Sequence, residues 1–219
     1  MNPNSLPSAS LVLLIAGYMF ISVLPTRADS PLTSTEFHQH YSNRQEIVRA
    51  AEMQTLDAGG LKFLTSENNT PAEKLAFVNA LGWKLERKEK SSRIYLKHLA
   101  SRRGIDPDYF ASELAKFSSE ELTLYGYMYA MERYLNDDAL GAIVPILRVA
   151  VNKHRESYVA QLALALVECQ MLMHIDSDNW HRVWERYERF LNNKELKRPL
   201  NAKALAEISD YIKLYDKSK

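Results

Sequence analysis

Helix-start signals recur along most of the chain after Thr33, and they constrain the fold more than any other feature of the sequence. A capping box pairs a Ser or Thr with a Glu or Gln three positions later, and the two side chains satisfy free backbone donors at a helix start. The chain contains four such pairs: Thr33/Glu36, Ser42/Gln45, Thr70/Glu73 and Ser118/Glu121. Between these signals apolar residues repeat every three or four positions, and no segment alternates as a strand does. We therefore expect an all-α fold.

The helices expected from these signals cover most of the chain. They span residues 34–58, 71–87, 91–103, 107–117, 119–136, 139–152, 157–175, 178–192 and 202–216. Gly59-Gly60 is expected to end a helix, and Pro145 is expected to kink a helix or delay its start. Helices 119–136 and 157–175 are apolar on more than one side, which is typical of a helix packed between neighbours.

The first 28 residues differ from the rest of the chain. Residues 11–24, LVLLIAGYMFISVL, form an apolar run that is short for a membrane span but typical of a signal-peptide core. Thr26 and Ala28 are small residues of the kind that a signal peptidase recognises, so we expect cleavage after Ala28. The alternative is an uncleaved anchor, because no Lys or Arg precedes the run. Either way, residues 29–219 are expected to form one helical domain outside the cytoplasm, periplasmic or secreted.

Charge and cysteine content exclude several classes of function. Residues 1–28 hold one of the 28 basic side chains and none of the 27 acidic ones, so the rest of the chain is neutral. A neutral domain has no electrostatic footprint for nucleic acid or for an anionic membrane, so a membrane is contacted only if the N-terminal segment is retained. The only cysteine, Cys169, lies in an apolar stretch and is expected to be a buried residue rather than a nucleophile.

Two stretches match in pattern, Ala80–Leu85 (ALGWKL) and Leu124–Tyr129 (LYGYMY), with Gly82 aligned to Gly126. Each is followed by a charged stretch and a second amphipathic helix. Over residues 71–191 the chain therefore resembles a degenerate tetratricopeptide repeat, although the period is longer than is usual for that family. The resemblance implies a solenoid of stacked antiparallel helix pairs whose concave side binds a peptide or protein segment, and it implies no catalysis. The alternative architecture is a globular helical bundle.

Motifs for catalysis or metal binding are weak. His38 and His40 are two positions apart and point to different sides of a helix, and the acidic stretch 176–179 lacks the later glycine and glutamate of a calcium loop. The sequence contains no nucleophile elbow and no phosphate loop. We therefore expect no metal and no cofactor. Glu168 stands out because a carboxylate on so apolar a helix needs a partner to stay ionised. A competing hypothesis is a small-ligand-binding or hydrolytic protein with a pocket around Glu168 and a neighbouring histidine.

Aromatic residues gather on the two matching stretches. Trp83, Tyr125 and Tyr129 combine a large contact area with a polar group, as residues of binding hot spots do. We predict these three as the partner-binding residues, and the alternative is that they serve only in packing. The sequence thus favours an exported helical interaction module that binds a protein or peptide partner, and it gives no indication of an enzyme.

Overall fold

A computed structural model describes residues 30–84, 89–175, 180–197 and 199–216. The predicted signal peptide and the acidic stretch 176–179 lie outside the described residues. Within the described part the chain forms helices and turns, with no strand and one isolated bridge between Ser157 and Lys197. The predicted all-α class is confirmed.

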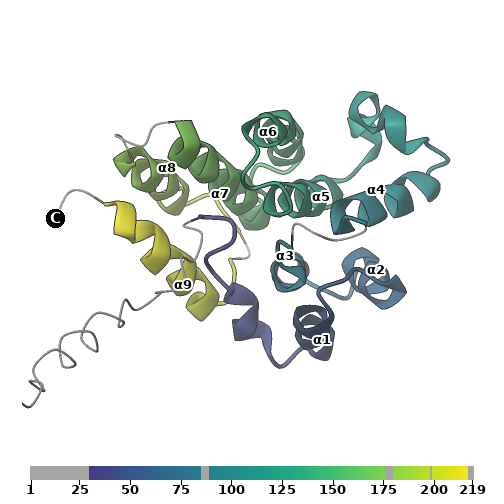
Figure 1. The fold of residues 1–219 in the computed structure, drawn as a ribbon, viewed down its shortest axis with the longest axis horizontal. Coiled ribbons are helices and arrows are strands. Elements are labelled where there is room, and N and C mark those ends of the chain that lie inside the picture. The colour runs from purple at the N-terminus through teal and green to yellow at the C-terminus, as the bar shows by residue number, and fades with distance from the viewer. Residues whose placement is uncertain (1–29, 85–88, 176–179, 198, 217–219) are drawn as a thin grey trace, which may run out of the picture.

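The helices follow one another with short connections (Figure 1). The α-helices are α1 (Gln45–Met53), α2 (Ala58–Thr65), α3 (Pro71–Leu81), α4 (Ser91–Ser101), α5 (Ser119–Met131), α6 (Asp137–Lys153), α7 (Tyr158–Ile175), α8 (His181–Leu191) and α9 (Ala202–Ile212). The 3-10 helices are η1 (Phe37–Tyr41), η2 (Pro107–Ser112), η3 (Leu114–Lys116) and η5 (Lys213–Tyr215).

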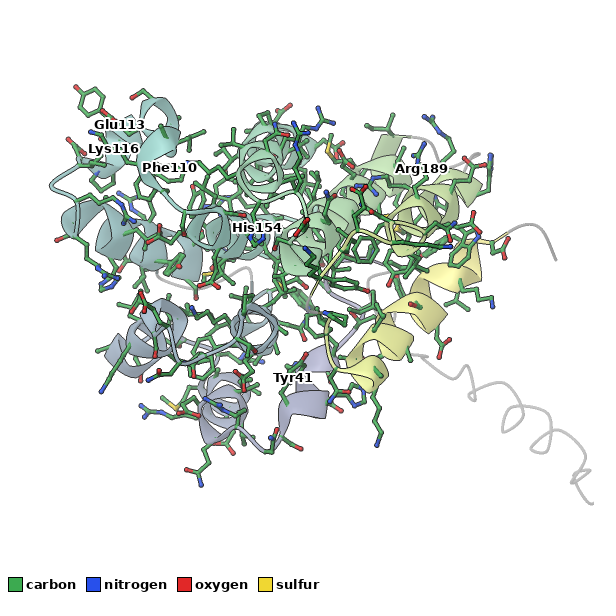
Figure 2. The ribbon with its side chains drawn as sticks, turned by 180° about the vertical axis from the view of Figure 1, so that it is seen from behind. Tyr41, Phe110, Glu113, Lys116, His154 and Arg189 are labelled. Carbon is green, nitrogen blue, oxygen red and sulfur yellow. The ribbon has the colours of Figure 1, made fainter. Side chains whose placement is uncertain are left out.

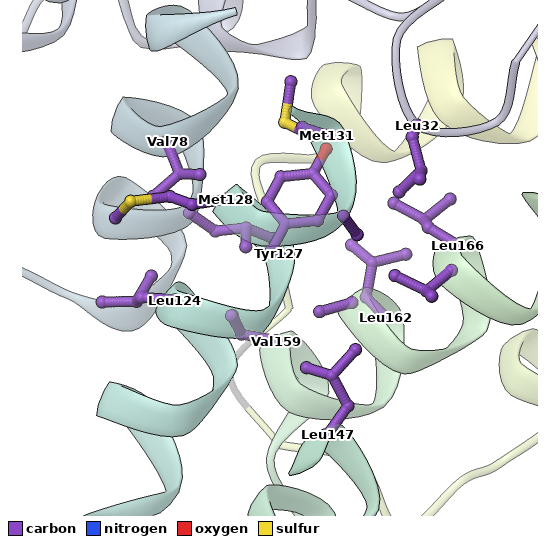
Figure 3. Close-up of a cluster of buried hydrophobic side chains, with 14 of the residues drawn as sticks. Leu32, Val78, Leu124, Tyr127, Met128, Met131, Leu147, Val159, Leu162 and Leu166 are labelled. Carbon is purple, nitrogen blue, oxygen red and sulfur yellow. The ribbon is translucent and has the colours of Figure 1, made fainter. Parts of the chain in front are cut away.

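Helices α5 to α8 pack in succession and form the larger part of the core. Each contacts the next, and α5 also lies against α7 (Figure 1). Buried side chains of α5, α6 and α7 meet at the centre, among them Tyr127, Leu147 and Leu162 (Figure 3). By length and composition α7 could cross a membrane, but 67% of it is buried within the domain. Its apolar surface is therefore used for packing against its neighbours.

The N-terminal segment 30–41 crosses the domain and joins parts that are distant in the sequence. Leu32 is fully buried and packs into the cluster around α7 (Figure 3). The side chain of Asn79 in α3 accepts a hydrogen bond from the His38 backbone N–H (3.1 Å) and donates one to the Thr35 carbonyl (3.0 Å). Helix α9 packs on η1 from the other side. Residues near both ends of the described chain thus share one core.

The predicted helix over residues 34–58 is wrong because the chain breaks once between η1 and α1 and again between α1 and α2. Gln54 has a left-handed backbone (φ 49°) and ends α1. Asp57 then starts α2 by accepting a hydrogen bond from Gly60 N at 2.8 Å. The two glycines expected to end a helix therefore lie in the first turn of α2. Gly60 fits there because a Cβ atom would lie only 2.7 Å from the Phe77 ring.

The predicted helix over residues 71–87 is too long at its C-terminal end. The helix α3 ends at Leu81, because the next residue, Gly82, adopts a left-handed φ of 68°. Trp83 consequently lies outside the helix.

The predicted capping boxes fall into two groups. Those begun by Thr70 and Ser118 start α3 and α5, and both reciprocal hydrogen bonds form in each. Those begun by Thr33 and Ser42 do not form. Thr33 belongs to the segment that crosses the domain, and α1 begins after Arg44, which makes no side-chain cap.

Two further segments differ from their predictions in detail. Residues 107–117 form the 3-10 helices η2 and η3 instead of an α-helix. Helix α6 starts at Asp137, where Asn136 accepts a hydrogen bond from Ala139 N (2.9 Å), and it continues through Pro145. Of the two expectations for Pro145, the later helix start is therefore wrong.

The stacked-pair arrangement stays a prediction. The pairs α5/α6 and α7/α8 are neighbours, whereas α4 packs mainly on α5. Gly82 ends a helix and Gly126 lies inside α5, so the two glycines that align in the sequence have different structural roles.

Candidate functional site

Two of the three predicted partner-binding residues, Tyr125 and Tyr129, lie together in a pocket of about 430 Å³, here called the tyrosine pocket. Helices α4 and α5 form its walls, and the turn leading into η2 closes one end. Besides the two tyrosines, it is lined by Ser92, Arg93, Leu96, Lys97, Asp106, Pro107, Asp108 and Arg133. Its rim therefore carries cations and carboxylates around an aromatic floor.

The two tyrosines differ in how much surface they offer. Tyr125 is only 8% exposed and packs edge-on against Phe110, with ring centroids 4.8 Å apart. Figure 2 places Phe110 at the end of the molecule formed by α4, η2 and η3. Tyr129 is partly exposed, and the guanidinium of Arg133 lies 3.9 Å from its ring centroid. Tyr129 and Arg133 thus form a cation–π pair at the pocket, and Tyr125 supports it from below.

Trp83 lies apart from the tyrosine pocket. It is 39% exposed and packs edge-on against Tyr134, with ring centroids 5.3 Å apart. Because α3 ends at Leu81, Trp83 lies outside the helix in which the prediction placed it. The structure therefore brings together Tyr125 and Tyr129, but not Trp83.

A buried carboxylate holds the two walls of the tyrosine pocket together. Glu132, at the end of α5, is 3% exposed. Its oxygens accept hydrogen bonds from Ser91 N (2.6 Å) and from Ser92 Oγ (2.6 Å) at the start of α4. The carboxylate thus acts as an N-terminal cap supplied by another helix, where the helix dipole also favours negative charge.

The structure also contains a pocket at Glu168, here called the arginine groove, of about 510 Å³ between α6, α7 and α8. It is lined by Val144, Arg148, Gln161, Glu168, Met171, Leu172, Ile175, Arg186, Arg189, Phe190 and Asn193. Glu168 accepts hydrogen bonds from Arg148 (2.9 Å) and from Arg186 (2.5 Å). Glu168 was expected to need a partner on so apolar a helix, and the two guanidinium groups supply it.

The histidine expected beside Glu168 lies outside the described lining of the arginine groove. None of the described residues that line the groove is a Ser, Cys, Thr, Tyr or His, so the expected neighbouring histidine is not among them. His174, on the same helix, contacts Asp137 and Gln170 instead. The residues that line this groove are suited to binding an anion on an apolar surface.

Other candidate groups for chemistry are occupied or buried. Cys169 is fully buried and its thiol contacts the Val183 carbonyl at 3.4 Å. His38 and His40 contact Asn79 and Glu207 separately. The described residues bring together no group of three or more His, Cys, Asp or Glu side chains that could hold a metal ion.

Sequence reasoning missed the arginines of both sites. Arg133 follows Tyr129 by four positions on one helix, so this contact is readable from the sequence. Arg182, Arg186 and Arg189 are spaced by four and three positions on α8, a signal for a cationic helix face. Arg148 comes from α6, and no local pattern places it near Glu168.

The buried acidic hydroxyl and thiol groups predict a loss of stability at high pH. Burial raises the pKa of Tyr125 and Tyr158 to about 12 from the ordinary 10.0, and that of Cys169 to about 12 from 9.0. Each folded-state pKa lies above its unfolded value, so the stabilisation is complete below about pH 9 and is lost as the pH rises towards 12. We expect the free energy of unfolding to fall by about 1.4 kcal/mol per pH unit for each group once the pH exceeds the ordinary pKa of that group, first for Cys169 and then for the two tyrosines. Urea denaturation between about pH 8 and pH 11 tests this, and a constant free energy would contradict it.

No protein-family model, curated protein or solved structure matches this chain. The function of the two sites therefore has to follow from their own geometry.

Proposed function

We propose that the protein is an exported, non-catalytic interaction module that binds a protein or peptide partner at the tyrosine pocket. The observation that carries the proposal is the partly exposed pair of Tyr129 and Arg133, 3.9 Å apart and supported by Tyr125. Tyrosine and arginine are the residues most enriched at binding hot spots, because they offer large contact areas and polar groups together.

The rim of the pocket favours a partner with charges of both signs. Arg93 and Lys97 lie on α4, and Asp106 and Asp108 lie at the entrance to η2. A mixed rim around an aromatic centre is the usual composition of a protein–protein interface. A partner segment that presents an acidic residue to Arg93 and an apolar side chain to Tyr129 fits this arrangement.

Export is part of the proposal and rests on residues 1–28. Ser30, two positions after the predicted cleavage site, is already buried and hydrogen-bonded within the domain. Cleavage after Ala28 would thus leave the folded domain intact, and the partner would be an envelope or secreted protein.

Capture of the partner from intact cells tests the proposal. After chemical cross-linking and affinity purification of the tagged protein, we expect Tyr129→Ala and Arg93→Glu each to reduce recovery of a specific partner about tenfold. Both side chains are exposed or partly exposed, so the melting temperature should change little. Tyr125→Ala is unsuitable as a first variant because it also removes a buried ring that contacts Phe110.

The matched control is Lys62→Glu, which reverses an exposed charge on α2 outside the pocket. It should leave capture unchanged. Equal recovery with Arg93→Glu, Tyr129→Ala and Lys62→Glu would show that the tyrosine pocket is not the contact surface.

A further inference from the structure

The arginine groove is a second site, separate from the tyrosine pocket. The two share no lining residue. In Figure 2, Arg189 of the groove and Phe110 beside the tyrosine pocket lie at opposite ends of the molecule. The groove therefore needs a ligand of its own.

The groove carries an excess of positive charge. Among the described residues, its lining includes three guanidinium groups, from Arg148, Arg186 and Arg189, and one carboxylate, from Glu168. Arg148 and Arg186 both pair with Glu168. Arg189 is exposed and forms no hydrogen bond or ion pair with any residue that the structure describes. The groove therefore offers one free guanidinium, and two more that share a single partner, to an incoming anion.

Polar and apolar residues are separated along the groove. Helices α7 and α8 run antiparallel, because Tyr158 at the start of α7 contacts Phe190 near the end of α8, with ring centroids 4.9 Å apart. Gln161, Arg189 and Asn193 therefore share one end of the groove.

Glu168 and its two arginines occupy the middle of the groove. The other end is apolar and is lined by Val144, Met171, Leu172 and Ile175. Ile175 is 69% exposed, so this end has an uncovered apolar surface. From Gln161 to Ile175 the groove follows about 21 Å of α7, at 1.5 Å per residue.

An acyl chain suits this floor better than a peptide. The backbone N–H and C=O groups of an extended peptide need partners, and the side chains of Met171, Leu172 and Ile175 offer none. The two amides at the polar end each already make one hydrogen bond, since Gln161 donates to the Arg155 carbonyl and Asn193 accepts from Glu195 N. A hydrocarbon chain needs no such partners, and about 510 Å³ lies within the usual range for one small ligand.

We propose that the arginine groove binds a single-chain fatty acid. Its carboxylate lies between Arg189 and Arg186, and its chain lies along Met171 and Leu172 towards Ile175. Glu168 then competes with the ligand carboxylate for Arg148 and Arg186. This site does not depend on the proposed function of the tyrosine pocket.

Charge selectivity of binding tests the proposal. The probes are dodecanoate, dodecanol and dodecyltrimethylammonium, which share a chain and differ in head group, each below the concentration at which it forms micelles. Titration calorimetry should show dodecanoate binding at least about tenfold more tightly than either other probe. Equal affinities for the three probes, or no heat with dodecanoate, would overturn the proposal. The apolar run at residues 11–24 gives no preference for the anion, because it carries no charge.

Variants at two residues should change the affinity in opposite directions. Arg189→Glu should weaken dodecanoate binding about tenfold or more, because it replaces the free cation with an anion. Glu168→Gln should strengthen binding several-fold, because it releases Arg148 and Arg186 from their internal partner. If Glu168→Gln instead weakened binding, Glu168 would be a direct ligand contact and the proposed competition would be wrong.

Arg93→Glu is the matched control, since it makes the same charge reversal at the tyrosine pocket. Arg93→Glu should leave dodecanoate affinity unchanged while reducing partner capture. Arg189→Glu should weaken dodecanoate binding and leave partner capture unchanged. If the capture results contradict the tyrosine pocket as the partner site, the dodecanoate results still test the arginine groove, and the converse also holds. Loss of dodecanoate binding in both variants would indicate non-specific attraction to basic surface rather than a defined site, and would also overturn the proposal.

Discussion

Replacing Glu132 with alanine is expected to lower the free energy of unfolding by about 3 kcal/mol. The carboxylate is 3% exposed and accepts hydrogen bonds from Ser91 N and Ser92 Oγ, each at 2.6 Å. The alanine variant leaves these donors at the start of α4 without their charged acceptor, in a place that water reaches poorly. It also removes a negative charge from the positive end of the helix dipole. Urea denaturation followed by circular dichroism measures the change.

Two control variants separate the contribution of the cap from general effects. Glu132→Gln keeps the shape and one acceptor but loses the charge, and we expect it to cost about half as much. Glu52→Ala removes an exposed glutamate from α1 and should change the free energy of unfolding by less than about 0.5 kcal/mol. If Glu132→Ala were as mild as Glu52→Ala, the carboxylate would not hold α4.

The effect of Glu132 should extend to the tyrosine pocket. Arg133, the next residue, lies over the Tyr129 ring, and its guanidinium also donates to Ser92 Oγ at 3.3 Å. One junction therefore fixes the start of α4 and orients the cation of the pocket. A variant that loosens this junction should weaken partner capture even though Glu132 itself is buried away from the partner.

The features that could be predicted from the sequence are those that local contacts determine. The capping boxes of Thr70 and Ser118 form as predicted because both members of each box lie within one helical turn. Tyr125 and Tyr129 lie together because residues four apart share a helical face, so this contact follows from their spacing in the sequence. Such contacts depend little on the rest of the fold.

Several features that sequence reasoning missed depend on distant residues or on a backbone choice that the sequence leaves open. The box of Thr33 does not form because Leu32 is drawn into the core and Asn79 holds the following backbone. Trp83 lies outside the predicted helix because Gly82 adopts a left-handed backbone, which glycine permits but does not require. The partners of Glu168 come from α6 and α8, so its environment depends on how three helices pack.

Gly126→Ala is expected to destabilise the protein by about 2 kcal/mol, although alanine is the better helix former by about 1 kcal/mol. Gly126 lies inside α5, where a Cβ atom would be 2.5 Å from Leu147 Cδ2 and 2.8 Å from Leu147 Cγ. Leu147 on α6 is fully buried, so it cannot move aside into solvent. The close approach of α5 and α6 therefore requires a residue without a side chain. Denaturation in urea measures the loss.

Gly141→Ala is the matched control, and it should have the opposite sign. Gly141 lies in α6, is exposed, and would place its Cβ with no atom within 4 Å. The same substitution should there raise the free energy of unfolding by about 1 kcal/mol, through helix propensity alone. If Gly126→Ala lowers the free energy of unfolding and Gly141→Ala raises it, the loss at Gly126 comes from the contact between α5 and α6. A gain in stability at both positions would contradict that contact.

A double-mutant cycle then assigns the cost to one side chain. Leu147→Val shortens the residue that a Cβ at position 126 would meet, and alone it should cost about 1 kcal/mol through the space it leaves. In that background Gly126→Ala should cost less than it does in the parent protein, because the added methyl group occupies part of the vacated space. We expect a coupling energy of at least about 1 kcal/mol, favourable to the pair. Strict additivity would mean that α5 and α6 relax apart as rigid units, and that Leu147 does not set their separation.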